Sequence, residues 1–378
     1  GEHFLPPEAN ELLKTLQSQS PPVAWGEIHR ILSNAWGEKL EEFEIDPQPV
    51  GSASLGQVHK AFHKPSQKWK AIKVQYPGVD LAIDTDLRAI RSFLGLLKLL
   101  PSQFKTDHLF AEIREMLIQE MDYVQEARQT MAYRTRLHGD PRFIVPEVDE
   151  AFSSAKILVT SFEPGVAVDS PEVQGLPQKD RNQLALDFLD LYFQELFQWG
   201  VVQTDPHLGN YRVRLAEGQK PRFILFDFGA VRTYPMEFRK PYYQMISAAL
   251  HSDRRALSEA ARRLQFIQDG DSERLQKFFE DFCLGTVEPF LTSDHPGHNP
   301  EFLSLHDEYD WKRSDLPQRL SKIVFSMISE FQVRTPPREI LFLDRKTGGV
   351  FIFLSVLKAK VKARPLLDLY LKRALTGG

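Results

Sequence analysis

The sequence has almost no cysteine and no long apolar run. Cys283 is the single cysteine among 378 residues, so the chain has no disulfide framework and a reducing compartment is expected. No apolar run approaches the roughly 20 residues that a membrane-spanning helix needs. The first ten residues lack a basic start and an apolar core, so we expect no signal peptide. Together these absences predict a cytoplasmic location, either free or peripheral to a membrane.

The chain also lacks a strong excess of charge of either sign. Its formal net charge is −4, which gives no reason to expect nucleic acid as a partner. With 42% hydrophobic and 26% charged residues, the composition is that of an ordinary globular protein with a sizeable core. The length suits one large two-lobed domain or two to three small ones.

The order of the expected elements indicates two parts. Short helices are predicted over residues 1–46, and DPQPV interrupts this pattern at 46–50. Strands are expected at 50–62, 68–76, 156–162 and 222–229. A long helix is expected at 108–138 and an apolar helix at 181–199. The chain then reads as almost wholly helical to its end. A strand-rich part is therefore followed, after a hinge-like Glu-Pro-Gly, by a larger helical part.

Two polar loops carry residues that suit phosphoryl transfer. In VVQTDPHLGN, Asp205 and Asn210 stand five positions apart in a loop before a strand. Turn chemistry alone also explains Asp, Pro, Gly and Asn in a loop. Asp227 ends an apolar strand in ILFDFGA, where a turn cap is again the simpler interpretation. In phosphoryl transfer the three residues stand in the order base, metal-binding amide and metal-binding carboxylate.

The strand-rich part offers a lysine and a glycine-containing loop. Lys73 lies inside the strand pattern AIKVQ, where it is either a surface residue or a ligand of nucleotide phosphates. Residues 51–56 read GSASLG, with Ala53 where kinases carry the middle glycine of their phosphate loop. In the long predicted helix, Glu120 falls on an apolar seam formed by Ile113, Leu117, Val124, Ala127 and Met131. A carboxylate there needs a partner.

Five segments, in order along the chain, resemble the UbiB/AarF family of atypical protein-kinase-like proteins. They are GSASLGQVHKA, AIKVQYPGV, EMDYVQEA, QTDPHLGN and FDFGAVR. The resemblance implies a kinase-like two-lobe α+β fold with an N-terminal helical extension (1–48), an N-lobe (49–163) and a mostly helical C-lobe (164–378). It also implies ATP and Mg²⁺ as cofactors and ATPase activity rather than protein-kinase activity, in ubiquinone or other isoprenoid-lipid metabolism.

The resemblance also assigns roles to individual residues. It implies that Lys73 binds nucleotide and is held by Glu126, that Asp205 is base-like, and that Asn210 and Asp227 bind the metal. An alanine-rich nucleotide loop matches Gly51, Ser52, Ala53, Ser54 and Gly56, and the regulatory E-x-D element falls on Glu120 and Asp122. The family's K-x-G-Q motif precedes the segment at which this sequence starts, so its autoinhibitory role is not carried over. The transmembrane helices of one branch are not carried over either.

The expected function is Mg²⁺-dependent ATP binding with hydrolysis or phosphotransfer in support of isoprenoid-quinone or related lipid metabolism. Two alternatives remain at this point. One is a small-molecule kinase of the aminoglycoside or choline type, which shares the D-x-H-x-x-N loop. The other is a non-catalytic lipid-binding scaffold that nucleotide switches. A basic cluster, Lys358, Lys360, Lys362, Arg364, Lys372 and Arg373, is either a solvated face or a contact with an anionic membrane surface.

Overall fold

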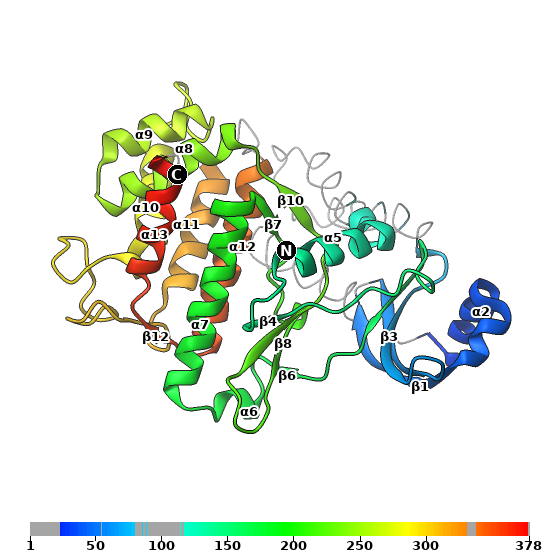
Figure 1. Cartoon of the computed structure of the whole chain (residues 1–378). Helices are drawn as coiled ribbons and strands as arrows, with labels where there is room; N and C mark the ends of the chain where they lie inside the picture. Colours follow the sequence, from blue (N-terminus) through cyan, green and yellow to red (C-terminus); the bar gives the residue numbers. More distant parts are fainter. Residues whose placement is uncertain are drawn as a thin grey trace. The chain divides into compact units, whose positions relative to one another are not determined.

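A computed structural model describes residues 23–53, 55–79, 85, 88, 114, 117–330 and 338–376 (Figure 1). The chain divides into two compact units. The first contains the chain up to Pro164 together with the short segment Ile224–Ala230. The second contains Gly165–Phe223 and the chain from Val231 onward. The segment that carries Asp227 therefore belongs to the first unit, although the sequence around it belongs to the second.

The first unit is built on a four-stranded antiparallel sheet in the order β1-β2-β3-β5. Successive side chains of a strand point to opposite faces of the sheet. Ile72 and Val74 of β3 are fully buried in a core that also holds Ile28 and Leu32 of α2. Lys73 therefore points to the opposite face. The elements are α2 (Trp25–Trp36), η1 (Gly37–Glu42), β1 (Phe43–Ala53), β2 (Gly56–His63), β3 (Lys68–Gln75), β4 (Phe143–Ile144) and β5 (Ile157–Ser161).

Helix α5 (Tyr123–Arg136) packs on the sheet face that carries Lys73. Tyr123 and Ala127 contact Leu158, the β5 residue that pairs with Lys73 in the sheet register. The helix begins at a clear cap, because the side chain of Asp122 accepts a hydrogen bond from the backbone N–H of Gln125. The first turn of α5, which contains Glu126, is therefore held against the sheet.

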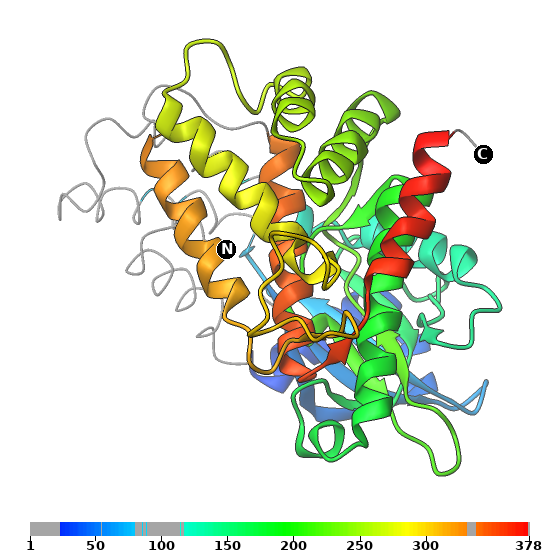
Figure 2. The same cartoon turned by 90° about the vertical axis from the view of Figure 1, so that its left-hand side faces the viewer.

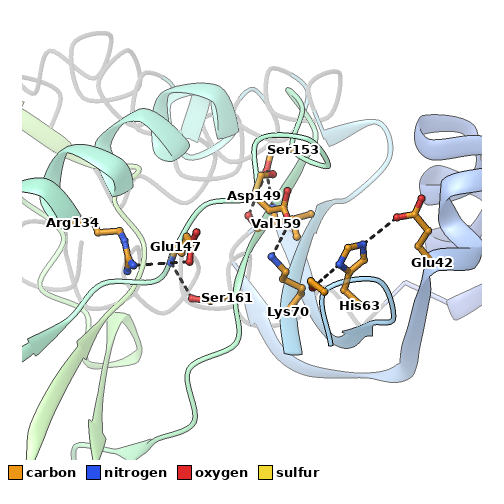
Figure 3. A network of polar contacts seen from close by, with 10 residues as sticks. Glu42, His63, Lys70, Arg134, Glu147, Asp149, Ser153, Val159 and Ser161 are labelled. Atoms are coloured by element: carbon orange, nitrogen blue, oxygen red, sulfur yellow. Dashed lines mark hydrogen bonds and ion pairs between the residues drawn. The ribbon is translucent and has the colours of Figure 1, made fainter. Parts of the chain in front are cut away.

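A network of polar contacts ties the segment after β4 to the rest of the first unit (Figure 3). The ammonium group of Lys70 on β3 lies 2.7 Å from the carboxylate of Asp149. Arg134 of α5 reaches Glu147 at 4.0 Å, and the backbone N–H of Glu147 donates to the hydroxyl of Ser161. Lys70 lies on the same side of β3 as Ile72, so this ion pair is on the face opposite Lys73.

The second unit is mostly helical and has an aromatic core. Phe188 of α7 stacks on Phe353 of α12 with ring centroids 3.8 Å apart, and Tyr211 meets both rings edge-on. Helices α7 and α13 lie side by side in Figure 2. The helices are α6 (Pro171–Gln174), α7 (Gln178–Phe193), η2 (Gln194–Trp199), η3 (Leu208–Asn210), α8 (Met236–Leu250), α9 (Arg254–Arg263), α10 (Glu273–Val287), η4 (Glu288–Phe290), α11 (Leu316–Glu330), α12 (Arg338–Val356) and α13 (Arg364–Thr376).

Short strands frame the polar loop of the second unit. β7 (Val201–Gln203) leads into this loop and pairs with β10 (Val231–Thr233). β8 (Tyr211–Arg214) leaves the loop and pairs with β6 (Val166–Ala167). The remaining strands are β9 (Arg222–Leu225), β11 (Tyr309–Asp310) and β12 (Lys360–Val361). The loop that holds Asp205 and Asn210 is thus anchored by a strand at each end.

Three of the expectations about individual elements are wrong. Strand β1 begins at Phe43 rather than near residue 50, and the proline-containing stretch lies inside it as an irregular part of the β1–β2 pairing. The long helix expected over 108–138 is interrupted at Met121 and Asp122. The short strands β10, β11 and β12 lie where only helix was expected. The helices expected within residues 1–22 lie outside the described residues.

Candidate functional site

Lys73 and Glu126 form a close ion pair in the first unit. The ammonium nitrogen of Lys73 lies 2.8 and 2.9 Å from the two carboxylate oxygens of Glu126. The side chains are 15% and 4% exposed, so the pair is largely shielded from water. A carboxylate oxygen of Asp227 lies 3.6 Å from the same ammonium group. The structure therefore brings three of the expected site residues together.

Burial and mutual charge set the ionisation of this group. Burial by itself lowers the pKa of Lys73, but the carboxylates of Asp227 and Glu126 outweigh it and raise that pKa, so the lysine stays cationic. Burial raises the pKa of Glu126 to about 7, and the negative charges of Asp227 and Glu120 act in the same direction. Two carboxylates thus share the ammonium group of Lys73. The site carries negative charge that a cation would compensate.

Asp227 follows β9 in an unusual backbone conformation. Its φ angle is 56°, in the left-handed region that residues other than glycine seldom occupy. One carboxylate oxygen accepts a hydrogen bond from the backbone N–H of Gly229 at 3.2 Å. The next side chain, Phe228, packs on Tyr133 of α5 with ring centroids 4.5 Å apart. The side chain of Asp227 is 37% exposed, so the strained turn presents a carboxylate that a ligand is able to reach.

The expected nucleotide loop lies beside Tyr123. A Cβ atom added to Gly56 would lie 2.5 Å from the carbonyl oxygen of Val74 and 2.7 Å from the hydroxyl of Tyr123. Only glycine fits at this position without a shift of the neighbouring chain. The Lys73 ammonium lies 5.0 Å from the centre of the Tyr123 ring, so this one side chain touches both the loop and the lysine. Gly51 has open space around it.

The other residues of the expected loop are only partly described. Ser54 lies outside the described residues. Ser52 and Ala53 are described as backbone only, as the last residues of β1. Their expected contact with nucleotide stays a prediction.

The E-x-D element lies at the break before α5. The side-chain amide of Gln75 donates to the carbonyl oxygen of Met121, which anchors the element to β3 two residues after Lys73. A Cβ atom on Gly229 would lie 3.9 Å from the Cα of Glu120, so the element also borders the turn of Asp227. The interruption changes the helix register, and Val124 is 40% exposed rather than part of an apolar seam. Glu120 is half-buried at the end of the preceding helical segment, and Asp122 is the cap of α5.

Asp205 and Asn210 are hydrogen-bonded to each other in the second unit. The amide nitrogen of Asn210 donates to one carboxylate oxygen of Asp205 at 2.8 Å and lies 3.3 Å from its backbone carbonyl oxygen. The other carboxylate oxygen of Asp205 accepts a charge-assisted hydrogen bond from Arg345 at 2.7 Å. His207 closes the intervening turn by accepting from the N–H of Gly209. Because the amide nitrogen of Asn210 donates to Asp205, this contact does not use the amide oxygen.

Sequence reasoning missed Tyr123, Gln75 and Arg345. Gln75 donates to the carbonyl oxygen of Met121, and Tyr123 lies beside Lys73 and Gly56. These contacts join segments that are far apart in the sequence, so no local spacing indicates them. Arg345 stands 140 positions after Asp205, and no local pattern joins the two. One irregularity in the sequence could have indicated this region. The segment RKTGG, at 345–349, places two charged residues and two glycines inside an apolar helix pattern.

Comparison with known proteins shows the family of this chain. The profile of the ABC1 atypical kinase-like domain matches residues 15–261. The chain belongs to this family, which is the family indicated by the UbiB/AarF resemblance. The matched residues include the lysine of β3 and both polar loops, but α12 lies beyond them.

Members of the ABC1 family are similar to this chain over most of its length. Atypical kinase coq-8, mitochondrial, of Caenorhabditis elegans is 31% identical over 94% of this chain and 45% of the relative. Atypical kinase COQ8B, mitochondrial, of Danio rerio is 29% identical over 97% of this chain and 56% of the relative. The chain thus spans about half the length of these curated relatives.

A solved structure is also similar to this ABC1-family chain. It is the complex of Rv3197 with erythromycin from Mycobacterium tuberculosis, with a TM-score of 0.66 and 26% identity. The alignment covers 96% of this chain and 87% of that protein. The similarity confirms the kinase-like α+β fold.

Two further observations bear on metals and membranes. Among the described residues, no group of three or more His, Cys, Asp or Glu side chains is arranged to hold a metal ion by itself. Such a cage is not what Mg²⁺ requires, because nucleotide-bound Mg²⁺ takes one or two protein oxygens and completes its shell with phosphate oxygens and water. In the part of the chain that the structure describes, no helix has the length and apolar character to cross a membrane.

Proposed function

We propose that this chain binds Mg-ATP and hydrolyses it, as an atypical kinase-like ATPase that supports isoprenoid-quinone or related lipid metabolism. The observation that carries the proposal is the position of Lys73. Its ammonium group lies 2.8 Å from a largely buried glutamate and 3.6 Å from the more exposed Asp227. In kinases a strand lysine held by a helical glutamate binds nucleotide phosphates beside a metal-binding aspartate.

The residues proposed to bind metal suit magnesium, each considered in its own unit. In the first unit Asp227 offers a reachable carboxylate, and in the second unit Asn210 offers an amide oxygen. Both are hard oxygen ligands of the kind that Mg²⁺ prefers. When bound, Mg²⁺ would supply charge neutralisation for phosphate oxygens. Lys73 would bind the phosphates, and Glu126 would hold Lys73 in place. Gly56 would hold the loop close to β3 and Tyr123, since a Cβ atom there would meet the carbonyl oxygen of Val74.

In the second unit, we propose that Asp205 orients the attacking nucleophile. Its carboxylate is fixed by Asn210 on one oxygen and by Arg345 on the other. A carboxylate held in this way would accept a hydrogen bond from water and align it for attack. We propose water as the acceptor because the family resemblance implies ATPase rather than protein-kinase activity. Glu120 and Asp122 would act on the site indirectly, through the start of α5.

The proposed lipid link rests on the family resemblance, and the proposed compartment rests on the relatives' names and on the cysteine. Two relatives carry the word mitochondrial in their names. The single cysteine of this chain is buried, and burial raises its pKa well above the usual value, so the thiol is unreactive. We propose a reducing compartment, a description that includes the cytosol and the mitochondrial matrix.

The experiment that tests the proposed function is a turnover assay with radiolabelled ATP and Mg²⁺, with and without vesicles that contain isoprenoid lipid. Wild-type protein should release inorganic phosphate, and Asp205→Asn should lower kcat about 100-fold. Asp253→Asn is the matched control, because Asp253 caps α9 of the same unit and lies outside the polar loop. Phosphate release without labelled protein or lipid supports hydrolysis.

Two other results would contradict the proposal and identify its replacement. Label transferred to a small molecule in a cell extract would indicate a small-molecule kinase. Binding of Mg-ATP with no turnover in the presence or absence of lipid would indicate a scaffold that uses nucleotide as a switch.

A further inference from the structure

Helix α12 contacts the Asp205 loop of the second unit at three successive places. The guanidinium group of Arg345 lies 2.7 Å from a carboxylate oxygen of Asp205. The side chains are 21% and 26% exposed, so the pair is partly shielded from water. Asn210 holds the other oxygen of Asp205 at 2.8 Å. With a partner on each oxygen, the carboxylate plane of Asp205 has a defined orientation.

Lys346 holds the two strands that flank the loop. Its ammonium nitrogen lies 3.4 Å from the side-chain oxygen of Gln203, at the end of β7, and 3.3 Å from the hydroxyl of Tyr211, at the start of β8. It also lies 3.3 Å from the carboxylate of Glu195, which accepts a hydrogen bond from the backbone N–H of Gln203. Lys346 is 1% exposed, and such a buried cation persists only with partners of this kind.

Gly349 lets the helix approach the loop closely. A Cβ atom on Gly349 would lie 2.0 Å from Cβ and 2.3 Å from Cγ of Pro206, the residue that follows Asp205. The neighbouring Gly348 has open space around it. Glycine weakens a helix interior, so its presence at 349 has a structural explanation in the contact with Pro206. The three residues Arg345, Lys346 and Gly349 lie beyond the segment that the family profile matches.

From these contacts we infer that Arg345 is a positioning residue for Asp205, and that Lys346 and Gly349 fix the loop in which Asp205 lies. The inference rests on the proposed function, because it assigns Arg345 a part in the orientation of the nucleophile by Asp205. Arg345 acts through Asp205 and needs no contact with nucleotide. Its loss should therefore change the rate of hydrolysis and leave nucleotide binding unchanged, since an active-site group displaced by about 1 Å costs up to about 100-fold in rate.

The test measures kcat and KM for Mg-ATP in Arg345→Gln, Arg345→Lys and the control Arg364→Gln. Arg364 also pairs with a carboxylate, Asp368 at 2.8 Å, and its side chain is 18% exposed, but its partner lies in α13. We expect Arg345→Gln to lower kcat about tenfold or more with KM within about twofold. Arg345→Lys should restore part of the rate, because a lysine keeps the charge but not the planar fork. Arg364→Gln should keep the wild-type kcat.

A double-mutant cycle separates positioning from general destabilisation. In the Asp205→Asn background, Arg345→Gln should change kcat by less than about twofold, because the group it positions is already lost. Equal losses of kcat in both backgrounds, or a rise in KM with an unchanged kcat, would overturn the inference. If wild type hydrolyses no ATP, the proposed function itself is contradicted; if wild type turns over and Arg345→Gln matches it, only the inference fails.

The glycines supply a second test that does not alter a charge. Gly349→Ala should lower kcat, because the new methyl group must displace Pro206 or the helix. Gly348→Ala is the matched control, with the same substitution at the adjacent position where the methyl group meets open space, and it should keep the wild-type kcat. Equal kcat values for the two alanine variants would contradict a role for α12 in fixing the loop.

Discussion

The ammonium group of Lys73 on β3 lies within 2.9 Å of both carboxylate oxygens of Glu126, 53 positions later in α5. The pair joins the sheet to the helix on the face where Asp227 also lies. Because both side chains are largely shielded from water, each needs the other as a partner. The relationship makes the stability of the first unit and its proposed nucleotide site depend on the same two residues.

Removal of one partner should therefore affect both properties. Glu126→Gln leaves the shielded ammonium of Lys73 with Asp227, at 3.6 Å, as its carboxylate partner, and we expect a loss of about 3 kcal/mol in the free energy of unfolding. The increase in melting temperature with saturating Mg-ATP should also shrink. Asp149→Asn is the matched control, since it breaks the Lys70 pair of the same strand on the opposite face. The control should lose stability but keep the full Mg-ATP shift; equal shifts in both variants would contradict the assignment of Glu126.

Gly56 and Gly51 should respond differently to the same substitution. Gly56→Ala places a methyl group 2.5 Å from a backbone oxygen of β3, and we expect a loss of about 1–3 kcal/mol in unfolding free energy. Gly51→Ala meets open space and should stay within about 0.5 kcal/mol of wild type. Denaturant unfolding measures both. Addition of Tyr123→Phe to Gly56→Ala should recover only part of the loss, because the contact with the Val74 carbonyl remains; a full recovery would show that the hydroxyl alone sets the constraint.

Much of the first unit was predictable because its sequence signals are local. The alternation of Ile72, Lys73 and Val74 places the lysine on the face opposite the apolar core, as the structure confirms. The start of α5 was not predictable from periodicity. The apolar seam through Glu120 requires one continuous helix, whereas Asp122 caps a new helix and changes the register, so that Tyr123 is buried and Val124 is exposed. A single capping side chain outweighed the apolar pattern around it.

The candidate site was predictable only where its residues lie in short motifs. Asp205 and Asn210 are five positions apart, and a loop of that length brings their side chains together. Arg345 was not predictable, because its partner lies 140 positions away and depends on how α12 packs in the second unit. The left-handed backbone of Asp227 was also hidden, since strain of this kind follows from tertiary structure rather than local preference.

Asp344 of α12 should make stability depend on pH. It is half-buried, and burial raises its pKa from 3.8 to about 7 in the folded protein. The folded state thus favours the protonated acid. The contribution of Asp344 to the free energy of unfolding is fully present below pH 3.8 and is lost as the pH rises through about 7. Asp344→Asn removes this loss. The melting temperature of the variant minus that of wild type should increase from about pH 5 to about pH 7 and then stay level to about pH 8. A difference that is constant with pH, or that falls, would show that Asp344 has an ordinary pKa.

The basic cluster near the C-terminal end of the described chain should bind anionic lipid. Lys358, Lys360, Lys372 and Arg373 are exposed, whereas Lys362 and Arg364 pair with carboxylates. We predict that the protein sediments with anionic vesicles at low salt and is released as salt rises, since counterions screen such contacts beyond about 10 Å at 0.1 M.

A charge-reversal pair tests which surface makes that contact. Lys372→Glu with Arg373→Glu should abolish sedimentation with anionic vesicles. Lys312→Glu with Arg313→Glu is the matched control, because it reverses an adjacent exposed pair elsewhere in the same unit and gives the same net charge. Binding to neutral vesicles equal to that with anionic ones, or an equal effect of the two variants, would favour a solvated face.

Calorimetric titration of ATP, with magnesium and with excess chelator, tests the proposed Mg-ATP site. Wild type should bind ATP tightly with Mg²⁺ and at least about tenfold more weakly without it, a difference of about 1.4 kcal/mol. Asp227→Asn should bind with and without Mg²⁺ equally weakly, because it lacks the carboxylate proposed to face the metal. If wild type binds ATP equally well without magnesium, or Asp227→Asn keeps the full magnesium dependence, the proposed Mg-ATP site at Lys73, Glu126 and Asp227 is wrong.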